Sequence, residues 1–136
     1  MNMATQAAPR GDDDTIEREI QEKGKTAARV TPADIEAVIA ETHYFTAADG
    51  VLGAAVADGV EDGATTPLGL LTFCVLVLRN GFTVTGESAC ASPENFDAEI
   101  GRKIARQNAV AKIWPLEGYL LKQRLHDWMQ PGIPQV

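Results

Sequence analysis

The sequence predicts an α+β fold, in which a small antiparallel β-sheet built on an Asn-Gly hairpin packs with an N-terminal helix and a long C-terminal helical segment. The first observation is the apolar run 70–78, which meets Asn80-Gly81 and continues into residues of alternating character. This is the strongest local hairpin signal, because Asn and Gly both tolerate the positive φ of a type I′ turn. The other two are a capped helix start at Thr31 and helical apolar spacing after residue 92.

The chain is short enough to be one domain, since its 136 residues match the usual size of a single core. We place that α+β domain at residues 31–128. Residues 1–30 are predicted to be a disordered or peripheral N-terminal segment, with at most a short polar helix within 15–25. Residues 129–136 are predicted to be an extended C-terminal tail.

The first helix of the domain begins at Thr31-Pro32-Ala33-Asp34, which offers an N-cap hydroxyl, a proline at the first helical position and an acid in the first turn. Its apolar stripe runs to about His43. Residues 46–66 are rich in Gly, Ala, Asp and Thr and are predicted to be a mobile loop, with a lid over a site as the alternative.

The hairpin register follows from a two-residue loop. It pairs Arg79 with Phe82 and Val77 with Val84. The first strand is then apolar on both faces, so the hairpin must be covered on both. Because a lone hairpin is marginal in water, helices or a second copy of the chain must supply that cover.

The C-terminal segment is predicted to start at Ser92, with Pro93 at the first helical position. Pro115 should kink the segment or begin a second helix, because it has no amide hydrogen and crowds the preceding turn. The expected apolar face recurs at helical spacing and consists of Phe96, Ile100, Ile104, Asn108 and Ala111.

Composition excludes several classes of protein. The net charge of −7 argues against binding of a nucleic-acid polymer, which needs a broad basic surface. No apolar run is long enough to span a bilayer and no N-terminal stretch resembles a signal peptide, so we expect a cytoplasmic protein that does not bind membranes. Cys74 and Cys90 lack metal-ligand spacing and are predicted to be reduced, buried thiols.

Catalytic motifs are absent from the sequence. Gly24-Lys25-Thr26 looks like the end of a phosphate-binding P-loop, but Glu19 stands where that motif needs glycine. The chain has no serine elbow, no paired-histidine metal motif and no CxxC. We therefore predict a protein that is not an enzyme, with no catalytic residue, metal or cofactor.

The informative feature is an arginine pair. Arg102 and Arg106 stand four residues apart on one helix face, and Arg106 has no acidic neighbour three or four positions away. Arg106 is either a solvated side chain or a phosphate ligand, because guanidinium forks bind phosphate through paired hydrogen bonds. Phe82, beside Arg79 in the predicted turn, is either a core ring or an exposed platform on which a base could stack.

Five blocks of residues carry a resemblance to a known family. They resemble the small phage proteins known as the gene-49/gene-66-like family over about residues 68–124, with weaker similarity from Thr31 to Phe45. The blocks are Asn80-Gly81-Phe82, Ser88-Ala89-Cys90, Pro93-Glu94-Asn95-Phe96, Gly101-Arg102-Lys103-Ile104-Ala105-Arg106 and Lys112-Ile113-Trp114-Pro115-Leu116-Glu117-Gly118-Tyr119-Leu120-Leu121.

The pattern also resembles the first type of Thoeris anti-defence protein, a phage-encoded sponge. That resemblance implies a protein that binds glycocyclic ADP-ribose in the host bacterial cytoplasm without cleaving it. Relatives assemble as hexamers, implying a dimer-based homo-oligomer here, and some hold cyclic di- and trinucleotides. The implied roles are adenine stacking for Phe82 and phosphate binding for Arg106 and Arg102, with Asn95 as a polar contact. Arg79 completes the set of predicted ligand-binding residues.

Two other functions remain open. The apolar hairpin, with Trp114 or Trp128 as an anchor, would suit a phage structural protein or a protein that binds a host protein. A nucleotide hydrolase is the third hypothesis, and measurable turnover of a cyclic nucleotide would support it.

Overall fold

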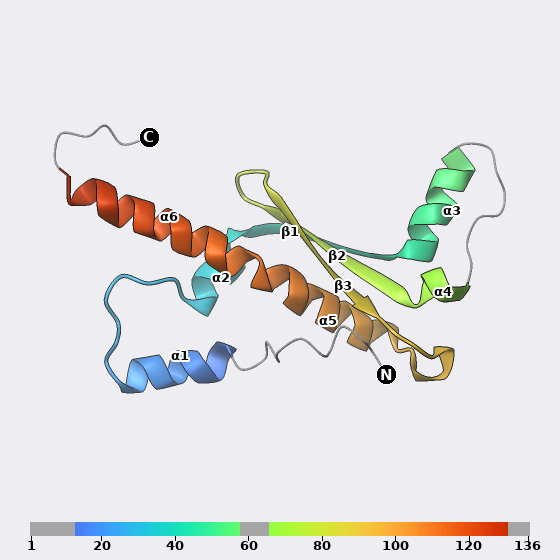
Figure 1. The fold of residues 1–136 in the computed structure, drawn as a ribbon, viewed down its shortest axis with the longest axis horizontal. Coiled ribbons are helices and arrows are strands. Elements are labelled where there is room, and N and C mark those ends of the chain that lie inside the picture. Colours follow the sequence, from blue (N-terminus) through green and yellow to red (C-terminus); the bar gives the residue numbers. More distant parts are fainter. Residues whose placement is uncertain (1–12, 58–65, 131–136) are drawn as a thin grey trace.

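The computed structural model describes residues 13–57 and 66–130, and it confirms the α+β class (Figure 1). Its strands form one antiparallel sheet in the order β1-β2-β3. The strands are β1 (Ile39–Thr46), β2 (Leu71–Leu78) and β3 (Thr83–Ala89). The helices are α1 (Asp13–Glu22), α2 (Pro32–Val38), α3 (Ala47–Ala57), α4 (Thr66–Gly69), α5 (Ala98–Ala111) and α6 (Ile113–Trp128), with a 3₁₀ turn η2 (Pro93–Asn95).

Strands β2 and β3 are adjacent and antiparallel, but the predicted two-residue turn and its register are wrong. Val77 pairs with Thr83 rather than with Val84. The N–H of Leu78 donates to the carbonyl of Phe82 at 2.8 Å, so these two residues form the last pair before the hairpin loop. Every predicted pair is therefore displaced by one residue.

The loop between the closing pair Leu78 and Phe82 contains three residues, Arg79, Asn80 and Gly81. Gly81 has a φ of +88°, and no residue other than glycine has a positive φ in the described parts of the chain. Asn80 therefore lacks the backbone that a type I′ turn requires. Its side-chain oxygen instead accepts a hydrogen bond from the N–H of Phe82 at 2.9 Å. The longer loop places a single glycine at the left-handed position, where an L side chain would be strained.

The core lies between the sheet and α5. The side chains of β2 that face α5 are buried, namely Thr72, Cys74, Leu76 and Leu78. Helix α5 buries a stripe of small residues consisting of Gly101, Ala105 and Ala109. The predicted apolar face of this helix is wrong, since Ile100 is 52% exposed.

Small residues allow α5 to rest directly on β3. A Cβ atom at Gly86 would lie 2.3 Å from both the carbonyl oxygen of Ala105 and the amide nitrogen of Ala109. The side-chain amide of Asn108 also donates to the carbonyl of Glu87 at 2.8 Å. The helix backbone, rather than a layer of large side chains, therefore covers this strand.

The start of α5 differs from the prediction. Pro93 begins only the 3₁₀ turn η2, and Ser92 makes no capping bond through its side chain. The helix starts at Ala98, where the side chain of Asp97 accepts a hydrogen bond from the N–H of Ile100 at 3.0 Å. The cap therefore lies five residues later than predicted, on a side chain that is equally suited to the role.

The break near Pro115 is confirmed. Helix α5 ends at Ala111, Lys112 connects the two helices, and α6 begins at Ile113. Pro115 then lies in the first turn of α6, where its missing amide hydrogen costs no helical bond. Figure 1 shows that α6 continues from the end of α5 with a change of direction and extends beyond the sheet.

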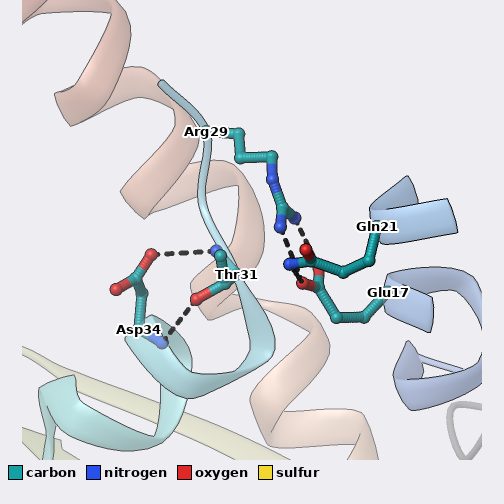
Figure 2. Close-up of polar contacts among 5 residues, drawn as sticks. All are labelled: Glu17, Gln21, Arg29, Thr31 and Asp34. Atoms are coloured by element: carbon teal, nitrogen blue, oxygen red, sulfur yellow. Dashed lines mark hydrogen bonds and ion pairs between the residues drawn. The ribbon is translucent and has the colours of Figure 1, made fainter. Parts of the chain in front are cut away.

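The helix start at Thr31 is also confirmed (Figure 2). The hydroxyl of Thr31 accepts from the N–H of Asp34 at 3.1 Å, and the Asp34 carboxylate accepts from the N–H of Thr31 at 2.9 Å. The helix ends at Val38, however, and not near His43. Residues 39–46 pair with β2 instead, because the sheet offers their aromatic and β-branched side chains a partner strand.

The predicted loop over residues 46–66 is wrong for the part that the structure describes. Residues 47–57 form α3, which starts with reciprocal bonds between Thr46 and Asp49 at 2.9 and 3.1 Å. Residues 66–69 form α4, and residues 58–65 lie outside the described residues.

The expected short polar helix is present as α1. The carboxylate of Glu17 holds the Arg29 guanidinium through both of its terminal nitrogens, with a distance of 2.7 Å from Nη2 to Oε2. Gln21 donates to the same carboxylate at 2.8 Å, as Figure 2 shows. The predictions for residues 1–12 and 131–136 lie outside the described residues.

The second face of the sheet has little cover from residues 13–57 and 66–130. On that face Phe73, Val75 and Val77 are only partly buried, and Phe45 of β1 packs on Phe73 with ring centroids 5.6 Å apart. Helix α3 contacts β1 and β2 but has no buried residue. Glu41, His43 and Glu87 lie on the same face, so its apolar part is a strip rather than the whole surface. Such a strip is a surface that a second copy or another protein could bury.

Candidate anion-binding site

Arg106 projects from α5 toward α2, where it has a partner that sequence spacing does not reveal. Its guanidinium donates to both carboxylate oxygens of Glu36, at 3.0 Å from Nη1 and 2.8 Å from Nη2. The interpretation of Arg106 as an unpaired arginine is therefore wrong. Its acidic neighbour comes from a different element, 70 residues away in sequence.

This ion pair changes the titration of both groups. The hydrogen bonds from Arg106 lower the pKa of Glu36 below its usual value, and the same bonds raise the pKa of Arg106. The pair lines a cavity of about 240 Å³ between α2 and α5, together with Ile35 and Trp114. A ligand phosphate that approached Arg106 would compete with the Glu36 carboxylate.

Arg102 stands one turn before Arg106 on α5, and both lie near Tyr44 of β1. The charges of Arg106 and Arg102 act to lower the pKa of Tyr44, although its burial outweighs them and raises it. Tyr44 and Arg102 also line one small cavity of about 90 Å³, together with Phe45 and Phe96. The Tyr44 ring is 39% exposed, so its surface is open to a ligand.

These three residues form the candidate anion-binding site: Tyr44, Arg102 and Arg106. No hydrogen bond or ion pair joins Arg102 to another side chain in residues 13–57 and 66–130. The arrangement offers the Arg102 guanidinium, which has no partner among the described residues, the Arg106 guanidinium, which is shared with Glu36, and an aromatic ring. Guanidinium groups bind phosphate and an aromatic ring stacks on a base, so the site has the chemistry to hold a nucleotide.

Sequence reasoning missed Tyr44, because the helix predicted from Thr31 left this residue just beyond its expected end. Pairing of Tyr44 with Cys74 in the sheet turns its side chain to the face that α5 covers. Helix α5 contacts β2 and β3 far more than β1, so Tyr44 lies beside the helix rather than beneath it. No local pattern in the sequence signals this position.

The other predicted site residues lie elsewhere in the chain. Phe82 is at the tip of the hairpin and is 54% exposed, which is compatible with the platform interpretation. Arg79 lies in the same loop, and its Nε donates to the carbonyl of Ala37 at 2.5 Å. Asn95 lies in η2, beyond the opposite end of β3.

A single chain does not bring all five predicted residues together. The seven residues of β3 separate Phe82 from the segment that carries Asn95, which amounts to roughly 20 Å of extended strand. The structure groups Arg102 with Arg106, and it separates this pair from Phe82 and Asn95.

The remaining polar groups have local roles. His43 contacts Glu41 at 2.9 Å on the exposed side of β1. Cys74 and Cys90 are both free and buried, and burial raises the pKa of the Cys74 thiol. In the described parts of the chain, no three His, Cys, Asp or Glu side chains are placed to hold a metal ion.

None of the helices within residues 13–57 and 66–130 combines the length and apolar character needed to cross a bilayer.

The fold and the site define a small α+β protein with one layer of helices on an antiparallel sheet and an arginine-bearing helix beside an exposed ring. The family model described as "Phage protein (N4 Gp49/phage Sf6 gene 66) family" matches residues 30–125. The chain therefore belongs to this family of phage proteins. Neither the curated proteins nor the solved structures contain a match.

Proposed function

We propose that this phage protein binds and sequesters a cyclic nucleotide immune signal, glycocyclic ADP-ribose in the first place, without cleaving it. The observation that carries the proposal is the cluster of Arg102, Arg106 and the exposed Tyr44 ring in a chain of net charge −7. The resemblance to Thoeris anti-defence proteins supports the same function. Cyclic di- and trinucleotides are further candidate ligands, and the site of action is the host bacterial cytoplasm.

The chemistry of the cluster suits a pyrophosphate that joins two nucleosides. Each hydrogen bond between a guanidinium and a phosphate oxygen contributes about 1.5–3 kcal/mol. A sponge must bind tightly and release its ligand unchanged, so binding groups are sufficient for its function. Tyr44 or Phe82 would stack on the adenine, which adds about 1–3 kcal/mol for each base.

The protein acts as a homo-oligomer in this proposal. Phe82 and Asn95 lie far from Arg106 in one chain, so a site that uses all of them needs residues from two copies. Phe45, Phe73, Val75 and Val77 form an apolar strip on a partly exposed sheet face, and a second copy would bury that strip. Light scattering at micromolar protein concentration should give a dimer or a larger assembly, and a monomer would contradict this part of the proposal.

Ligand retention tests the function directly. Purified protein is mixed with glycocyclic ADP-ribose, freed of unbound ligand and then heated, and the released compound is identified by mass spectrometry. We expect the intact ligand in stoichiometric amount. Failure to retain the ligand, or recovery of a cleaved product, would refute sequestration.

Two variants of α5 locate the site. Arg106→Gln should weaken binding at least tenfold, because it removes a phosphate ligand without adding a second carboxylate beside Glu36. Lys103→Gln is the matched control, since it removes the same charge from the same helix at an exposed residue whose ion pair is with Glu99, at 3.2 Å. Equal affinity of the two variants would remove Arg106 from the site.

A phage structural protein or a protein that binds a host protein is the second candidate function. The exposed aromatic residues of α6 favour it, because Trp128 is 67% and Tyr119 is 73% exposed. Aromatic side chains of this kind are common interface anchors. Capture of one defined host protein by the wild type and not by Trp128→Ser, with no nucleotide bound, would support this function instead.

A further inference from the structure

A cavity of about 360 Å³ lies away from the candidate anion-binding site, between α2, the hairpin tip and α6. Three arginines line it: Arg29 before α2, Arg79 in the hairpin loop and Arg124 on α6. Its apolar wall consists of Val30, Val38 and Leu121. We call this cavity the three-arginine groove.

Helix α6 supplies one side of the groove through residues at helical spacing. Glu117, Leu121 and Arg124 are separated by four and three positions, so they share one face of the helix. The hairpin loop supplies the opposite guanidinium. The Nε of Arg79 donates to the carbonyl of Ala37 at 2.5 Å, which holds the side chain against the end of α2.

Two of the three guanidinium groups are available to a ligand. Arg29 is occupied by Glu17. The terminal nitrogens of Arg79 and the whole guanidinium of Arg124 have no hydrogen-bond or ion-pair partner among residues 13–57 and 66–130. Two positive charges beside an apolar wall are therefore left without compensation by a bound carboxylate.

Two acidic side chains, Asp34 and Glu117, also line the groove, and their negative charges oppose the binding of an anion. Asp34 is engaged at the start of α2, where its carboxylate accepts from the N–H of Thr31 at 2.9 Å. Glu117 has no such bond among the described residues, and its charge would repel an anion. Asp34 keeps its negative charge when it accepts this bond, so both carboxylates weaken the anion site.

From this arrangement we infer that the three-arginine groove binds a small phosphate monoester, with Arg79 and Arg124 holding the phosphate. A dianionic phosphate matches two guanidinium groups in charge, and its oxygens can accept paired bonds from both. The apolar wall then receives the organic part of the ligand, and the volume lies within the range of small-molecule pockets. This inference goes beyond the proposed function, because Arg106 and Arg102 do not line the groove.

Phenyl phosphate is a suitable probe, since it joins a phosphate to a small apolar ring. Calorimetry should detect its binding to the full chain at millimolar concentration, with phenol binding much more weakly. Arg124→Gln should weaken binding at least tenfold. Lys122→Gln, on the same helix but outside the groove, should leave it unchanged.

Glu117→Gln should have the opposite effect on affinity, because removal of the repelling carboxylate should tighten phenyl phosphate binding severalfold. Circular dichroism of each variant confirms that the fold is retained. The inference is overturned if the wild type does not bind phenyl phosphate, if Arg124→Gln binds as tightly as the wild type, or if Glu117→Gln binds more weakly. Loss of binding in Arg106→Gln would also overturn it, since the phosphate would then bind at the other site.

The test of the three-arginine groove is independent of the test of ligand sequestration. Retention of glycocyclic ADP-ribose without binding of phenyl phosphate would reject the groove and keep the proposed function. Binding of phenyl phosphate that depends on Arg124, without retention of the cyclic nucleotide, would do the reverse.

Discussion

Gly86→Ala tests the closest contact in the fold, where the backbone of α5 lies directly on β3. The added Cβ would meet the carbonyl oxygen of Ala105 and the amide nitrogen of Ala109, each at 2.3 Å. An ordinary contact for such atoms is at least 3.4 Å. The helix would therefore have to move away by about an ångström, which separates the whole core interface.

The expected cost is large for the addition of one methyl group. Overpacking of a core costs about 1–3 kcal/mol, and backbone atoms on two sides cannot rotate away as a side chain can. We expect a loss of about 3 kcal/mol in the free energy of unfolding. For a domain of this size, that loss lowers the melting temperature by about 10 °C.

Thermal unfolding followed by circular dichroism measures the effect, at one protein concentration because self-association would shift the midpoint. Two other glycines complete a graded series. A Cβ at Gly101 would lie 3.1 Å from the hydroxyl of Thr72, a side chain that can adjust, so Gly101→Ala should cost less. A Cβ at Gly118 would meet no atom of the described residues within 4 Å beyond its chain neighbours and its own helix backbone, so Gly118→Ala should stabilise α6 by about 0.5–1 kcal/mol.

The order of the melting temperatures of the three variants tests whether α5 rests directly on β3. If Gly86→Ala melts with the wild type, or above Gly101→Ala, then α5 does not rest on the strand backbone. A Gly86→Ala protein that is insoluble while the other two fold would agree with the reasoning in direction and exceed it in magnitude.

Two further predictions concern the ion pairs. Glu36→Gln frees Arg106, so it should tighten cyclic nucleotide binding while costing at most about 1 kcal/mol of stability, because the pair is partly exposed; unchanged or weaker binding in isothermal titration would contradict competition between Glu36 and the ligand. The pKa of Glu17 is lowered from 4.5 to about 2, chiefly by its hydrogen bonds from Arg29. A lowered folded-state pKa means that the contact stabilises α1 fully above pH 4.5 and is lost as the pH falls toward about 2. An NMR titration of the Glu17 carboxyl carbon should show this low pKa, and Arg29→Gln should return it toward 4.5; a Glu17 that titrates normally in the wild type would refute the contact.

Features that depend on neighbouring residues were predictable from the sequence. The helix start at Thr31 and the break before Pro115 are confirmed, because capping bonds and a missing amide hydrogen act within one turn. The helix start predicted at Ser92 is wrong, although Ser92 and Pro93 carry the same capping signals as Thr31 and Pro32. Asp97 offered a second cap nearby, and sequence reasoning had no means to rank the two.

The candidate site was only partly predictable for a related reason. The spacing of Arg102 and Arg106 on one helix face is a local property, and it holds. The partner of Arg106 is Glu36, which is distant in sequence, and the ring beside it is Tyr44 of a strand that was predicted as the end of a helix. Only the packing of α2 and β1 against α5 brings these groups together.

The sequence by itself determined the α+β class, the membership in a phage protein family, the arginine pair, the helix start at Thr31 and the helix break near Pro115. Each of these depends on composition or on residues within a few positions of one another. The tertiary structure decided the hairpin register, the small-residue face of α5 and the salt bridge of Arg106. The physical reason is that a strand or helix face is chosen by what it packs against, and Gly86 can be recognised as a contact only once α5 lies on it.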